Sequence, residues 1–198
     1  MGARLDDLAA IESAVWHELA QAVRGRGHAW RVAVLATRNG DEADARSVVL
    51  REIDTAQRTL LIYTDARSAK VAQAAAHPLG MLVLWSAELG WQLRLQVQLE
   101  VADSGLAVSS RWAKIKLTPA AQDYISPLPP GSSLGSALAS TLGNALGSTP
   151  ATPAPQRKSR EHFAVLTARV QSVDWLELHA EGHRRARFDA GGRRWLAP

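Results

Sequence analysis

Two short segments of the chain combine arginine, lysine and hydroxyl residues at spacings that suit a phosphate group. The first spans residues 46–51 and reads Arg-Ser-Val-Val-Leu-Arg. On a β-strand, Arg46 and Leu50 would share one face. Ser47 and Arg51 would share the other. Such a strand could hold a phosphate at one end while its backbone faces a planar ring. The plain alternative is a surface strand bracketed by two arginines.

The second segment opens a helix directly after a predicted strand. Tyr63 and Thr64 end that strand, and Ser68 and Lys70 follow shortly after. Free backbone N–H groups at the helix start, the two hydroxyls of Thr64 and Ser68, and the lysine charge would converge there. These are the donors that a phosphate prefers. Simple capping of the helix by Asp65 or Ser68 accounts for the same residues without a ligand.

A side-chain amide opens a long alternating strand further along the chain. Gln92 follows Trp91 and precedes Leu93, Arg94 and Leu95. We expect its amide to contact polar atoms of a bound ring, and a surface amide is the alternative.

Other chemistries lack the residues they need. The chain has no cysteine, and its six histidines include one H-x-x-x-H pair, His179 and His183, with no cysteine pair to complete a zinc site, so no metal is expected. Neither a Walker loop nor a G-x-G-x-x-G motif occurs, and the one G-x-S-x-G match, at residues 131–135, lies in a Pro-, Gly- and Ser-rich segment and not on a predicted strand-to-helix turn. The sequence therefore gives no support to a hydrolase, a nucleoside-triphosphate enzyme or a Rossmann cofactor site.

The charge balance favours a small anionic ligand. The net charge is +4, and most arginines stand singly at strand ends and turns instead of along one face. A basic nucleic-acid-binding barrel is the weaker alternative, because nucleic-acid readers usually cluster their cations. No segment is long and apolar enough to span a membrane. With no cysteine and no secretory signal, a cytoplasmic location is the default expectation.

Hydrophobic periodicity divides the chain into helices and short strands. Apolar residues at three- and four-residue spacing predict a helix over 5–24. An Asn-Gly-Asp turn at 39–41 predicts a hairpin between its flanking strands. Residues 65–76 are predicted as a helix capped by Asp65, and residues 80–85 as a strand buried on both faces. The remaining predicted strands cover 30–34, 46–53, 59–63, 91–101, 163–173, 175–180, 185–189 and 194–198, and further helices cover 106–117 and 118–124.

These elements favour a mainly β fold with helices (α+β). Many short antiparallel strands suggest a closed or partly closed barrel, which removes exposed sheet edges. We predict a single domain over residues 1–198. A segment at about 126–160 is rich in Pro, Gly, Ser and Ala and is predicted to be an insertion or lid within that domain. Leucines at four-residue spacing predict a short helix over 134–146 inside it.

Three quoted segments together resemble a known family. RSVVLR, YTDARSAKVAQAAAHP and WSAELGWQLRL are similar, in order and spacing, to the flavin-binding blocks of the pyridoxamine 5′-phosphate oxidase family. Trp175, Arg187 and the closing WLAP also fit that family. The resemblance implies a split β-barrel that forms a homodimer with flavin mononucleotide (FMN) at the subunit interface.

The resemblance also assigns residues to the cofactor. Arg46 and Lys70 would hold the FMN phosphate, with Tyr63 and Thr64 nearby. Residues 48–51 would line the isoalloxazine ring, and other residues would complete the site, some from the partner subunit. The cofactor residues assigned in this way are Arg46, Ser47, Val48, Val49, Leu50, Arg51, Tyr63, Thr64, Arg67, Ser68, Lys70, Gln92, Trp175 and Arg187.

The sequence departs from the family pattern at two places. The family's Ser-Arg-Lys at the helix start is here Ser68-Ala69-Lys70, and Arg67 could substitute for the missing arginine. The family's R-x-H-x-R stretch appears as residues 183–187, with His183 and Arg185 in swapped order. His183 and Arg185, with Arg51, are the candidate substrate ligands, and the swap predicts that pyridoxamine 5′-phosphate is a poor substrate.

The resemblance implies an FMN-dependent oxidoreductase acting on a small substrate, possibly phosphorylated. The flavin carries the redox chemistry, so no acid–base pair is required and no catalytic side chain is predicted. A flavin reductase, or a flavin-binding protein without turnover, is the alternative on the same fold.

Overall fold

The computed structural model describes residues 4–133 and 162–198. The predicted helix at 134–146 and most of the insertion at 126–160 lie outside the described residues. Among the helices that the structure describes, none is long and apolar enough to cross a membrane. The elements in chain order are α1 (Leu8–Arg24), η1 (Ala29–Arg31), β1 (Val32–Asn39), β2 (Glu42–Asp54), β3 (Thr59–Asp65), α2 (Ala69–Ala76), β4 (Leu79–Ser86), β5 (Trp91–Ala102), α3 (Leu106–Ile115), η2 (Pro119–Tyr124), β6 (Phe163–Glu177), β7 (Arg184–Asp189) and β8 (Gly192–Leu196).

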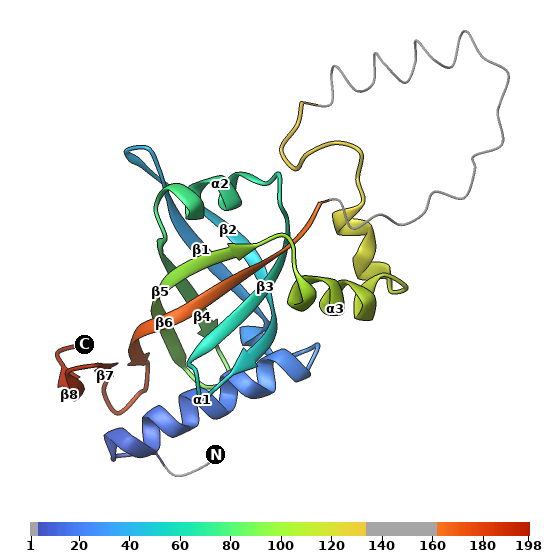
Figure 1. The fold of residues 1–198 in the computed structure, drawn as a ribbon. Helices are drawn as coiled ribbons and strands as arrows, with labels where there is room; N and C mark the ends of the chain where they lie inside the picture. The colour runs from blue at the N-terminus through green and yellow to red at the C-terminus, as the bar shows by residue number, and fades with distance from the viewer. Residues whose placement is uncertain (1–3, 134–161) are drawn as a thin grey trace, which may run out of the picture.

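The strands form a closed ring of antiparallel pairs. The order is β3-β2-β1-β4-β5-β6, and β6 pairs back with β3 (Figure 1). Strands β7 and β8 extend the sheet beyond the ring from β6. The prediction of a mainly β fold with helices is confirmed.

Strand β6 is where the barrel splits. One of its edges pairs with β5 along most of its length. The other edge pairs with β3 over residues 163–169 and with β7 over residues 172–177. The same edge of β6 therefore pairs first with β3 and then with β7. Beyond this point β7 and β8 leave the ring and form a separate two-stranded extension at the end of the barrel where α1 lies (Figure 1).

Side chains alternate between the barrel interior and its outer face, as the period of a β-strand requires. Leu35, Leu82 and Leu95 are fully buried inside. Helix α1 covers one end of the barrel with its apolar stripe, and α2 covers the other end (Figure 1). The buried residues of α1 are Ile11, Glu12, Val15, Leu19 and Ala22.

The hairpin predicted at residues 39–41 is present. Asn39 pairs with Glu42, and Gly40 adopts φ +61° in the connecting turn. Glycine has no Cβ atom, so it adopts a left-handed backbone conformation with little steric strain. This explains the glycine at this position.

Four details of the sequence prediction were wrong. Asp65 ends β3 instead of capping the helix, because it pairs with Phe163 of β6, and α2 begins at Ala69. Strand β4 is not buried on both faces: Trp85 is 46% exposed, because only one face of a barrel strand meets the core. Trp30 lies in the short 3-10 helix η1 and not in a strand. Residues 163–173 and 175–180 were predicted as two strands, but β6 runs unbroken to Glu177.

Candidate functional site

A cavity of about 230 Å³ lies between β2, β3, the start of α2 and the segment after α3. Seven of the residues predicted for the cofactor line it together. They are Ser47, Val48, Val49, Arg51, Tyr63, Thr64 and Lys70. Ile62, Asp65, Asp123, Tyr124 and Pro130 complete the lining.

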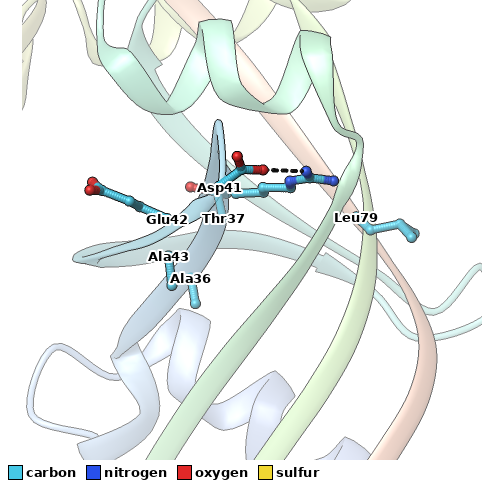
Figure 2. A pocket seen from close by; sticks show the side chains of 7 residues that line it. Ala36, Thr37, Asp41, Glu42, Ala43 and Leu79 are labelled. Atoms are coloured by element: carbon cyan, nitrogen blue, oxygen red, sulfur yellow. Dashed lines mark hydrogen bonds and ion pairs between the residues drawn. The ribbon is translucent and has the colours of Figure 1, made fainter.

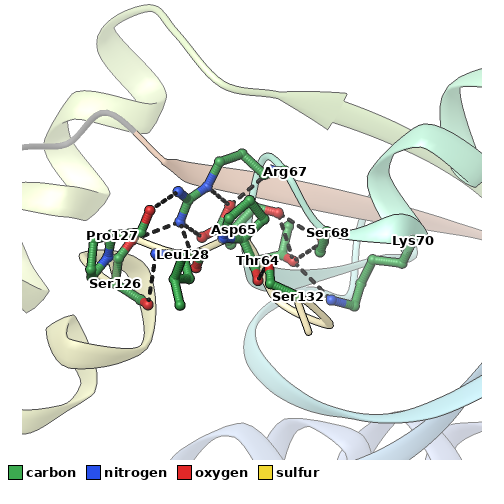
Figure 3. Close-up of polar contacts among 10 residues, drawn as sticks. Thr64, Asp65, Arg67, Ser68, Lys70, Ser126, Pro127, Leu128 and Ser132 are labelled. Carbon is green, nitrogen blue, oxygen red and sulfur yellow. Dashed lines mark hydrogen bonds and ion pairs between the residues drawn. The ribbon is translucent and has the colours of Figure 1, made fainter. Parts of the chain in front are cut away.

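Two cations lie near each other at the α2 end of this cavity, where Lys70 belongs to the lining and Arg46 lies behind it. The Lys70 ammonium donates to the Thr64 hydroxyl at 3.2 Å (Figure 3). Burial lowers the pKa of Lys70, and the positive charge of Arg46 lowers it further. A folded protein that keeps two like charges close together at a partly buried point is prepared for an anion, since an anion relieves both costs.

Arg46 is held in place from behind the cavity. Its guanidinium donates to the Gln73 side-chain oxygen at 2.8 Å and to the Thr37 hydroxyl. It also pairs with the carboxylate of Asp44. The hydrogen bond from Gln73, and then the charge of Arg46, lower the pKa of Asp44 against the opposing effect of burial. The supporting residues Thr37, Asp44 and Gln73 carry no motif, and sequence reasoning missed them.

The turn between β3 and α2 leaves the helix start without a side-chain cap. Ser68 occupies the N-cap position but makes no capping hydrogen bond. Its hydroxyl instead donates to the carbonyl of Asp65 at 2.7 Å and lies 3.1 Å from the Thr64 hydroxyl. The N–H groups of the first turn of α2 therefore add to the positive potential around Lys70.

Arg67 has a different role from the one expected. Its guanidinium pairs with Asp65 at 2.7 Å and donates to the carbonyls of Ser126, Pro127 and Leu128 (Figure 3). The hydrogen bonds from Arg67 lower the pKa of Asp65, although burial alone would raise it. Arg67 thus fastens the segment after η2 beside the cavity instead of offering its charge to a phosphate.

Tyr63 connects the cavity wall to α3. Its hydroxyl donates to Glu52, which also accepts two hydrogen bonds from Arg111 at 2.9 and 3.0 Å. Burial, and then the hydrogen bond to Glu52, raise the pKa of Tyr63. For Glu52, burial alone would raise the pKa, but the bonds from Arg111 and Tyr63 outweigh it and lower the pKa. The hydroxyl of Tyr63 is therefore committed to this structural network.

Tyr124 forms the far wall of the cavity and was not predicted. It packs edge-on against Phe163, with ring centroids 5.3 Å apart. Phe163 also contacts Tyr63 and Trp112, and this second apolar cluster positions η2 beside β3. A lone tyrosine in a short helix has no signal that could have identified it from the sequence.

The remaining predicted residues lie elsewhere. Leu50 and Trp175 are fully buried in the barrel core, where Trp175 packs edge-on against Trp91 at 5.4 Å. Gln92 lies on β5, and Arg187 on β7 pairs with Asp189 at 3.0 Å. Arg185 forms two hydrogen bonds with Asp174, and His183 Nδ1 accepts from the backbone N–H of His179. None of these side chains lines the cavity in the single chain.

A shallow pocket at the tip of the β1–β2 hairpin has few groups that could bind a ligand (Figure 2). Its only cation, Arg38, already pairs with Asp41 at 3.1 Å. Leu79 at its rim is 60% exposed. Across residues 4–133 and 162–198, no cluster of His, Asp and Glu could hold a metal ion.

Comparison with known proteins agrees with the lining of the cavity. Residues 13–103 match the family model of the pyridoxamine 5′-phosphate oxidase FMN-binding domain. Over this region, which is a little less than half of the chain, the protein is similar to the pyridoxamine 5′-phosphate oxidase family. The matched region carries most of the cavity lining, and the cofactor of this family domain is FMN. A pyridoxine/pyridoxamine 5′-phosphate oxidase of Thermosynechococcus vestitus is 40% identical over 70 residues, a match that spans 34% of this chain and 32% of that protein.

Solved structures share the whole fold. A pyridoxamine 5′-phosphate oxidase-related, FMN-binding protein from Nostoc punctiforme superposes with a TM-score of 0.66 at 23% identity, over 97% of this chain and 99% of that chain. PhzG from Burkholderia lata 383 gives a TM-score of 0.66 at 19% identity, over 98% and 94% of the two chains. At these identities the likeness concerns the fold.

Replacing Lys70 by methionine should stabilise the empty protein and weaken FMN binding. Because the pKa of Lys70 is lowered, the unfolded chain holds this proton more tightly than the folded one. The stability of the wild type should therefore rise as the pH increases from the lowered pKa toward the ordinary lysine value. Lys70→Met should lack this rise and show a larger free energy of unfolding at neutral pH.

The same variant should bind FMN about one to two decades more weakly, the worth of one charge-assisted contact. Urea unfolding and fluorescence titration with FMN measure the two effects. Lys116→Met, at an exposed position, is the matched control. Unchanged stability and unchanged FMN affinity in Lys70→Met would show that Lys70 is an ordinary surface lysine.

Proposed function

We propose that this chain is an FMN-dependent oxidoreductase whose cofactor phosphate is held by Lys70 and Arg46. The observation that carries the proposal is a pair of neighbouring cations in the matched FMN-binding domain, with Lys70 in the lining of the cavity and Arg46 directly behind it. When bound, FMN supplies the redox chemistry by exchanging a hydride with the substrate. The protein contributes binding, orientation and exclusion of water.

The residues present fit FMN. A phosphate needs charge-assisted donors, and Lys70, the Thr64 hydroxyl and the uncapped start of α2 supply them. A planar ring needs apolar cover, and Val48, Val49 and Ile62 lie in the same lining. Asp65, an acidic residue of the lining, is already paired with Arg67.

We also propose that the site is completed by a second copy of the chain. The cavity of about 230 Å³ in one chain is smaller than the roughly 300–1,000 Å³ of typical ligand pockets. The strand registers show where the missing wall can come from. Residues that pair directly across antiparallel strands share a face, and one outer face can be followed from β2 to β7.

That outer face joins the cavity to the predicted residues that lie outside it. Ser47 pairs with Val34, and Val34 pairs with Val83. Trp85, two residues further along β4, pairs with Gln92. Gln92 pairs with Leu176 and Leu176 with Arg185, and Arg187 follows on the same face.

An exposed apolar stripe divides this outer face. Val32 is 52% exposed, Val34 43% and Trp85 46%, and the three lie on the adjacent strands β1 and β4. A two-fold axis through the stripe would bury it. It would also bring Gln92 and Arg187 of the partner subunit toward the cavity that begins at Ser47. Trp175 faces the barrel interior, so in this arrangement it supports β5 and β6 from inside.

Pyridoxamine 5′-phosphate is not the substrate that we propose. Arg185 is already paired with Asp174 at 2.7 Å, and His183 is occupied by the backbone of its own turn. A phosphate ester needs donors in fixed places, and a displaced donor loses both binding energy and alignment.

The direct test of the proposed function is the cofactor and its turnover. The purified protein should show flavin absorbance, and mass spectrometry of the released cofactor should identify FMN. Oxygen consumption with pyridoxamine and pyridoxine 5′-phosphates should stay far below the median enzyme rate of about 10 per second. Rapid turnover of either ester would show that the protein is an ordinary pyridoxamine 5′-phosphate oxidase. A flavin that is reduced only by nicotinamides would favour the reductase, and one that nothing reduces would favour a carrier.

Substitution of the apolar stripe should separate the subunits and empty the site. Trp85→Glu places a charge in the proposed interface, so sedimentation velocity should give a monomer, and the monomer should bind FMN weakly. Leu106→Glu is the control, because Leu106 is 86% exposed on α3, away from the stripe. Circular dichroism confirms that both variants are folded. A dimeric Trp85→Glu protein, or a monomer that retains full FMN affinity, would contradict the proposed interface.

A further inference from the structure

A second, larger cavity adjoins the proposed flavin cavity. Its volume is about 530 Å³, and it shares Val49 and Arg51 with the smaller one. Arg26 reaches it from the turn after α1 and Arg31 from η1, and Ile115 and Pro119 form its opposite wall. The cavity thus lies between the connection from α1 to β1, strand β2 and the segment from α3 to η2.

The three arginines of this cavity differ from most others in the protein. Most of the other arginines pair with carboxylates. They are Arg4, Arg46, Arg58, Arg67, Arg111, Arg184, Arg185, Arg187, Arg193 and Arg194. Within the part of the chain that the structure describes, Arg26, Arg31 and Arg51 have no ion-pair partner, and no aspartate or glutamate lines their cavity. Three uncompensated positive charges therefore face one hollow.

Two of these guanidinium groups are held in position. Arg31 donates to the carbonyls of Val23 at 2.7 Å and Ala22 at 3.3 Å, which fixes it at the end of α1. Arg51 lies over the Tyr63 ring at 5.9 Å, and its buried Nε has no hydrogen-bond partner among the described residues.

We propose that this cavity is the substrate site and that it takes an aromatic or other cyclic acid. The oxyanion of the ligand, a carboxylate or a phosphate, lies among Arg26, Arg31 and Arg51. Its ring packs on the apolar walls made by Val49, Ile115 and Pro119. This inference rests on the proposed function, because the shared residues Val49 and Arg51 place the ligand beside the flavin.

Calorimetric titration with 1-naphthoate, 1-naphthyl phosphate and neutral 1-naphthamide tests the site. The two acids should bind the FMN-loaded protein at least about tenfold more tightly than the amide, because only they can accept charge-assisted hydrogen bonds. Arg26→Gln should weaken naphthoate binding by about tenfold and leave the FMN affinity unchanged. Arg24→Gln is the matched control, since Arg24 lies nearby without lining the cavity.

The outcomes separate this site from the flavin site. Equal affinity for naphthoate and naphthamide, or equal effects of Arg26→Gln and Arg24→Gln, would overturn the proposal. Competition between naphthoate and FMN would also overturn it, because the larger cavity would then be part of the flavin pocket. If the protein binds no FMN, the proposed function fails. The same titrations on the empty protein would still show whether the arginines select acids.

Discussion

The pairing of β3 with β6 closes the barrel and also determines where the cavity proposed for the cofactor can form. Seven residues of β3, up to Asp65, pair with β6, and the backbone N–H of Ala66 continues with a hydrogen bond to His162 at 2.7 Å. The chain can begin α2 only after this pairing ends. Lys70 consequently lies in the first turn of the helix, with its ammonium beside the Thr64 hydroxyl. The whole phosphate-binding arrangement depends on this shared boundary between strand and helix.

Closure also creates an electrostatic tension at this end of the barrel. Arg46 and Lys70 are brought close together and partly removed from water, and each charge opposes the other. Asp44, Gln73 and Thr37 hold Arg46 in this position without covering Lys70. A protein that accepts such a cost in its empty state recovers it when an anion binds. The cavity with three unpaired arginines repeats the same principle on the other side of Val49.

The sequence allowed the fold class to be predicted, and it also pointed to seven residues that line one cavity, because both depend on local patterns. Alternating apolar residues identified the strands, and the short segments at 46–51 and 63–70 placed cations and hydroxyls on neighbouring elements. The role of Arg67 could not be predicted, because its partners at 126–128 are distant in sequence. The roles of Tyr124, Gln73 and Glu52 could not be predicted either, because their partners Phe163, Arg46 and Arg111 are also distant in sequence. The inward orientation of Trp175 depends on the register of β5 with β6, which no local pattern reveals.

The central claim is that each flavin site needs residues from two subunits, and mixing two defective variants tests it most directly. Arg46→Ala should bind FMN poorly through loss of a phosphate ligand, and Arg187→Ala through loss of the residue proposed to come from the partner. After unfolding and refolding together, half of the dimers should be mixed, and each should carry one intact site. The mixture should then regain about a quarter of the wild-type FMN sites. A mixture that binds no more FMN than the separate variants would contradict the account.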